Sequence, residues 1–120
     1  MKKTHSFLFA LALLFFIISC SKSGSNTGTG GGTPITCDGT AKTFALDVDP
    51  IIQSFCNKAN CHASGSSNGP GPITNHTQVF NARTAIRGAV ASGLMPQNTT
   101  LTMAQKTAIV CWIDNGALDN

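Results

Sequence analysis

A run of small residues limits how much of this 120-residue chain can fold. Positions 21–36 read SKSGSNTGTGGGTPIT and hold too little apolar surface to offset the entropy of ordering them. We therefore interpret residues 20–36 as a flexible linker and residues 37–120 as one folded domain of 84 residues. Because a core this small stabilises a fold only weakly, we expect a disulfide, a metal or a cofactor to contribute.

The N-terminus has the pattern of a secretory signal peptide. Lys2 and Lys3 precede the apolar run at 7–18, which is shorter than the ~20 residues that a spanning helix needs. A buried core helix does not fit, because the run is apolar on every face. Positions 17–20, IISC, resemble the lipobox of bacterial lipoproteins. That resemblance implies a signal peptide at 1–19, cleavage before Cys20, and acyl chains on Cys20 that anchor the chain in the bilayer of the cell envelope, facing the periplasm.

The charge pattern excludes several classes of function. The net charge of +3 comes from three lysines at positions 2, 3 and 22, whereas the folded domain has five basic residues and five aspartates. A balanced domain without a basic stripe does not indicate a nucleic-acid partner. The chain has no Glu, no nucleophile–base set and no phosphate-binding loop, so we do not expect an enzyme.

The spacing of apolar residues predicts three main helices and an all-α domain. Asp49 is expected to cap the first helix, which has Pro50 at its first position and runs to 55. The second helix is expected at 77–92, ending at Gly93, and the third at 104–114, ending at 115–116. Thr102 and Gln105 form a capping box before the third helix. The best strand candidate is the short segment 43–48, TFALDV.

The residues with the most chemistry are two thiols and an imidazole within seven positions, Cys56, Cys61 and His62. Three interpretations are open. The cysteines can add to the vinyl groups of a haem while His62 ligates the iron, as in C-x-x-C-H motifs. The three side chains can bind zinc, with a fourth ligand from elsewhere. Alternatively, the two cysteines form a disulfide and the histidine is incidental.

Over positions 44–117 the domain resembles class I c-type cytochromes. Segment 47–62, DVDPIIQSFCNKANCH, is similar to a first helix that runs into the attachment motif, although the spacer between the cysteines has four residues in place of two. Segment 69–72, GPGP, resembles the loop in which a proline carbonyl accepts a hydrogen bond from the ligand imidazole. Segment 93–117 is similar to the Met-Pro loop and the closing helix. The resemblance implies a small cytochrome c-like fold of three main helices around one covalently bound haem c.

The resemblance also implies the role of each site residue. Cys56 and Cys61 would form the thioether bonds, His62 would be the proximal iron ligand and Met95 the distal one. His76 is the rival distal ligand, although a histidine in a helix-cap sequence is usually solvated. Trp112 is expected in the core, against Phe55 or the haem edge.

Of the five cysteines, Cys20 is assigned to the lipid anchor, and Cys56 and Cys61 are assigned to the haem. Cys37 and Cys111 are then left, and an exported protein seldom leaves two thiols free, so we predict a disulfide between them. The sequence therefore predicts a membrane-tethered c-type cytochrome that exchanges single electrons with redox partner proteins at the membrane. The alternative is a haem-free binding or accessory lipoprotein in which Cys56–Cys61 and Cys37–Cys111 are both disulfides.

Overall fold

The structure, a computed structural model, describes residues 33–120. The signal peptide expected at 1–19, the acylation site at Cys20 and most of the linker expected at 20–36 lie outside the described residues. No helix of the described part is long and apolar enough to cross a membrane.

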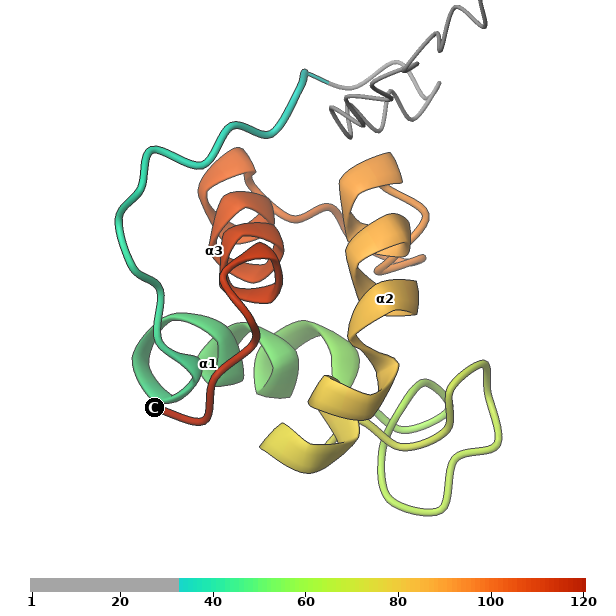
Figure 1. Ribbon diagram of the computed structural model, residues 1–120. Helices are drawn as coiled ribbons and strands as arrows, with labels where there is room; N and C mark the ends of the chain where they lie inside the picture. The colour runs from blue at the N-terminus through green and yellow to red at the C-terminus, as the bar shows by residue number, and fades with distance from the viewer. Residues whose placement is uncertain (1–32) are drawn as a thin grey trace, which may run out of the picture.

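All regular secondary structure in residues 33–120 is helical, which agrees with the all-α expectation. The first helix is continuous and consists of η1 (Phe44–Val48), α1 (Asp49–Ile51) and η2 (Ile52–Cys56), where η1 and η2 are wider π-type turns. The other two helices are α2 (His76–Ser92) and α3 (Met103–Asp114). In Figure 1, α2 and α3 lie side by side, and the first helix runs across one end of α3 toward α2, whose first turns extend beyond it.

The first helix begins earlier than the sequence predicts. The Thr43 hydroxyl accepts a hydrogen bond from the N–H of Leu46 at 3.3 Å, and the Asp47 carboxylate accepts one from the N–H of Thr43 at 2.7 Å. These reciprocal bonds begin a helix at 44, so the strand candidate at 43–48 and the cap at Asp49 were both wrong. Pro50 was predicted at the first helical position but is the seventh residue of the continuous helix, where it has no N–H to donate to the preceding turn.

The second helix ends where the sequence predicts. Gly93 follows α2 with a φ of 77°, a left-handed conformation in which glycine avoids the steric cost of a side chain. At the other end, the Asn75 side chain accepts a hydrogen bond from the N–H of Gln78 at 3.0 Å and caps the helix.

The third helix begins at Met103, one residue before the predicted start, and ends at Asp114 as predicted. The capping box of Thr102 and Gln105 is present, and the C-terminal cap is Asn115, directly before Gly116. Five of its twelve residues are buried, from Ala108 to Trp112.

The core joins the first helix to α2 and α3. Its largest fully buried side chains are Trp112, Ile52, Ile109, Val48, Val79 and Val110. Full burial of an aliphatic side chain of this size stabilises a fold by roughly 1.5–3 kcal/mol.

A disulfide joins Cys37 to Cys111, the pair that cysteine arithmetic selects. The two Cα atoms are 5.6 Å apart, and 74 positions separate the residues in sequence. The bond fixes the extended segment before the first helix to the buried face of α3.

Candidate cofactor site

A cavity of about 530 Å³ opens between the first helix, the loop after it, α2 and the segment that follows α2. This volume falls within the roughly 300–1,000 Å³ typical of cofactor and small-molecule sites. Its walls are largely apolar, with side chains that include Ile52, Phe55, Ile73, Ile86, Ala89 and Val90. Cys56, Cys61, His62 and Met95, which sequence analysis placed in one site, all line it.

The two motif cysteines are free thiols. Cys56 is the last residue of η2, so the π-type turn determines where its sulfur enters the cavity. Burial, and secondarily the nearby Cys61, raises the pKa of the Cys56 thiol to about 11. The sulfur of Cys56 is therefore kept protonated in an apolar setting.

The four-residue spacer forms a compact turn between the cysteines. The N–H of Cys61 donates to the carbonyl of Lys58 at 3.0 Å, and the N–H of His62 donates to the carbonyl of Cys56 at 3.2 Å. Asn60 has a φ of 63°, a left-handed conformation that asparagine tolerates better than most residues. The turn thus returns the chain to the cavity, and Cys61 and His62 line the same space as Cys56.

The imidazole of His62 is oriented by the glycine-proline loop. Its Nδ1 donates to the carbonyl oxygen of Gly71 at 3.0 Å. A carbonyl only accepts hydrogen bonds, so in the neutral ring the proton is on Nδ1 and Nε2 keeps a free lone pair. The expected loop therefore makes the expected contact, but the acceptor is the glycine between Pro70 and Pro72, not a proline.

Met95 comes from the segment after α2. The left-handed Gly93 turns the chain out of the helix, and the N–H of Met95 donates to the carbonyl of Ala89 at 3.2 Å. Met95 is half-buried and lines the cavity together with Pro96. A thioether therefore faces the space that the thiols and imidazole of positions 56–62 also face.

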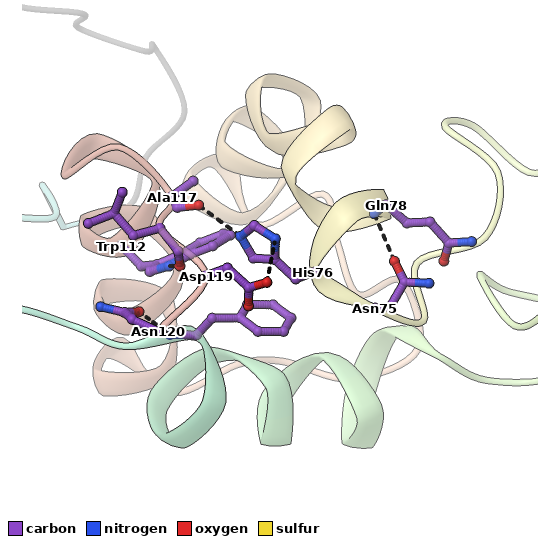
Figure 2. Close-up of polar contacts among 9 residues, drawn as sticks. Asn75, His76, Gln78, Trp112, Ala117, Asp119 and Asn120 are labelled. Carbon is purple, nitrogen blue, oxygen red and sulfur yellow. Dashed lines mark hydrogen bonds and ion pairs between the residues drawn. The ribbon is translucent and has the colours of Figure 1, made fainter.

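His76 does not line this cavity. Its Nε2 donates to the carbonyl oxygen of Ala117 at 2.9 Å, and its ring lies 4.9 Å from Phe44, 5.8 Å from Phe80 and 5.8 Å from Trp112, centre to centre. Figure 2 shows the imidazole beside Trp112, with dashed lines to Ala117 and Asp119 of the C-terminal segment. The expectation of a solvated histidine was wrong, and the structure gives no support to His76 as the rival ligand.

Trp112 is buried, as expected. Its ring packs 5.4 Å from Phe44 and its Nε1–H donates to the carbonyl of Leu118 at 2.9 Å. Its ring lies 5.8 Å from that of His76, centre to centre, and Trp112 is not among the residues that line the cavity.

Two further observations bear on the alternative interpretations. Within residues 33–120, no three His, Cys, Asp or Glu side chains are grouped so that they could hold a metal ion, which leaves the zinc interpretation without support. The haem-free interpretation requires a bond between Cys56 and Cys61, which are free here.

Sequence reasoning missed the polar residues that shape the loop after the motif. Asn60, Ser66 and Asn68 lie within segments that composition marks only as a spacer and a loop. The signal was weak, because asparagine and serine in such segments indicate turns without showing which carbonyls they bond.

Comparison of the chain with models of known protein families, with curated proteins and with solved structures finds no match. The site is therefore interpreted from its own residues.

Proposed function

We propose that this protein is a lipid-tethered c-type cytochrome that carries single electrons. The observation that supports this most is the convergence of Cys56, Cys61, His62 and Met95 on one apolar cavity. Met95 is far from the other three in sequence, and nothing in the spacing of a C-x4-C-H motif requires a methionine to face it.

The residues around the cavity fit a haem. Two free thiols are available for thioether bonds, and the Nε2 lone pair of His62 is available for iron. The sulfur of Met95 would be a further ligand that holds the iron, and a thioether ligand would raise its reduction potential. A bound haem supplies one-electron oxidation and reduction.

The chain's own residues would adjust that chemistry in three ways. The Gly71 carbonyl fixes the ring orientation of His62 and raises the basicity of Nε2. Aliphatic side chains from the first helix and α2 would surround the haem with a largely apolar wall. Because His62 and Met95 would both hold the iron, we propose an electron carrier and not an enzyme.

The proposed location follows from the N-terminal sequence. Acylated Cys20 would hold the domain at the bilayer, and the linker at 20–36 would let it reorient toward redox partner proteins. Tethering raises the local concentration of the carrier around membrane-bound partners.

The proposal is tested with cysteine variants of the full-length chain, expressed in a host that matures c-type cytochromes. We expect the wild-type chain to gain the mass of one haem and to keep it under denaturing conditions, and Cys56→Ala with Cys61→Ala to lose it. The pair Ser64→Ala with Ser67→Ala is the matched control, because it changes two exposed residues near the motif but leaves the cavity cysteines and the disulfide between Cys37 and Cys111 in place. Equal retention of haem by the first double variant, or no haem on the wild-type chain, would refute the proposal.

A further inference from the structure

The backbone of the attachment motif is held by the loop that follows it. The carbonyl oxygen of Cys61 accepts hydrogen bonds from the Ser66 hydroxyl and from Nδ2 of Asn68, the latter at 3.1 Å. The same Nδ2 donates to the carbonyl of Asn60 at 2.9 Å. In turn, the N–H of Asn68 donates to the Ser66 hydroxyl at 3.1 Å, so the two side chains act together.

This network continues to the imidazole. The carbonyl of Asn68 accepts a hydrogen bond from the N–H of Gly71 at 2.9 Å, and the carbonyl of Gly71 accepts one from Nδ1 of His62 at 3.0 Å. The N–H of Ile73 donates to the carbonyl of His62 at 2.9 Å. A closed path of hydrogen bonds therefore runs from Cys61 through Asn68 and Gly71 to the ring of His62.

The length of the spacer explains why such a network is needed. A four-residue spacer reverses the chain through Asn60, whose φ of 63° lies outside the helical region. The carbonyls of Asn60 and Cys61 therefore have no helical partners, and the side chain of Asn68 bonds both. One residue thus fixes two successive peptide planes immediately before His62.

From this geometry we propose that Asn68 is a positioning residue for covalent haem attachment. It holds Cys61 and His62 in the arrangement in which the second thiol and the imidazole face the cavity together. This inference rests on the proposed cytochrome function and assigns to the loop after the motif a role that the motif itself does not contain.

The test measures, on the full-length chain matured with haem, the fraction of molecules that carry two thioether bonds. Asn68→Ala removes both donors, and Asn68→Asp keeps the shape but presents a carboxylate oxygen to the two carbonyls. A net hydrogen bond is worth about 1 kcal/mol and each variant loses two, so we expect the doubly attached form to fall by between about fivefold and thirtyfold in each variant. Ser67→Ala is the matched control, since this exposed neighbour makes no side-chain hydrogen bond among the described residues.

Hydrogen exchange on the same proteins separates positioning from general stability. In the Asn68 variants we expect faster exchange in the segment 62–73, while amides of α3 exchange as in the wild-type chain. Full attachment in either Asn68 variant, or faster exchange throughout the domain, would overturn the role of Asn68. Absence of haem on the wild-type chain would instead overturn the cytochrome proposal itself.

Discussion

Removal of the disulfide between Cys37 and Cys111 should cost this small domain a large part of its stability. Cys37 is exposed and Cys111 is 2% exposed, so Cys37→Ser breaks the bond without creating a cavity in the core. The loss should therefore report on the cross-link itself.

The size of the effect follows from the loop that the bond closes. With 74 positions between the cysteines, the chain-entropy relation gives about 15 cal/mol/K of unfolded-state entropy, or about 4 kcal/mol at 25 °C. A domain of this size is stable by only about 5–15 kcal/mol, so the variant should be close to marginal. Its thermal midpoint should fall by roughly 15–30 °C.

Urea unfolding, followed by circular dichroism, measures this loss in the wild-type chain and in Cys37→Ser. Reductant is the internal control: it should bring the wild-type chain to the stability of the variant and leave the variant unchanged. A loss of free energy below about 1 kcal/mol would show that the unfolded chain is already constrained, and that the entropic reasoning is wrong for this protein.

Three other predictions concern side chains around the core and the cavity. His76→Ala should lower the free energy of unfolding by about 2–3 kcal/mol, because it removes one hydrogen bond and three aromatic contacts. Asp119→Asn should change the free energy of unfolding little, because the Asp119 side chain is 73% exposed. Chemical denaturation measures both changes. In the haem-free chain at pH 8, Cys56 should react with iodoacetamide about a hundredfold more slowly than a thiol of pKa 9, because a pKa of about 11 leaves about a hundredth as much thiolate. The rate at which Cys56 reacts should rise until the pH passes 11. A pH-rate profile in which Cys56 reaches its plateau near pH 9 would contradict this prediction. In the haem-loaded protein, Met95→Ala should lower the midpoint potential by on the order of 0.1 V and open the site to added imidazole, as redox titration and absorption spectra would show; an unchanged potential would mean that Met95 is not a ligand.

Much of the fold could be predicted from local sequence signals. The left-handed Gly93 and the Thr102–Gln105 capping box depend on neighbours within one helical turn, so they could be located without tertiary structure. The start of the first helix could not be predicted in this way, because the pattern of apolar and polar residues in TFALDV, at 43–48, fits a short strand as well as a helix. The bond from the N–H of Phe44 to the side chain of Asn120 shows that contacts distant in sequence help to place it.

The residues of the candidate site could be predicted from the sequence, but the hydrogen bonds that hold them could not. A cysteine pair followed directly by histidine is recognisable from spacing, and a methionine before a proline in a loop is an unusual place for core packing. The acceptor for the His62 ring was misassigned within the GPGP loop, because the choice between neighbouring carbonyls depends on left-handed backbone at Gly69 and Gly71. The position of His76 depends on where the C-terminal segment returns, which no local pattern encodes.

The most direct test of the central claim is a haem stain of the full-length protein on a denaturing gel, with an absorption spectrum of the reduced protein. The host must mature c-type cytochromes, and the sample is boiled before loading. We predict a band that retains haem after boiling, with sharp α and β absorption bands in the reduced protein. A colourless protein in which Cys56 is bonded to Cys61 would contradict the account and favour a haem-free lipoprotein held by two disulfides.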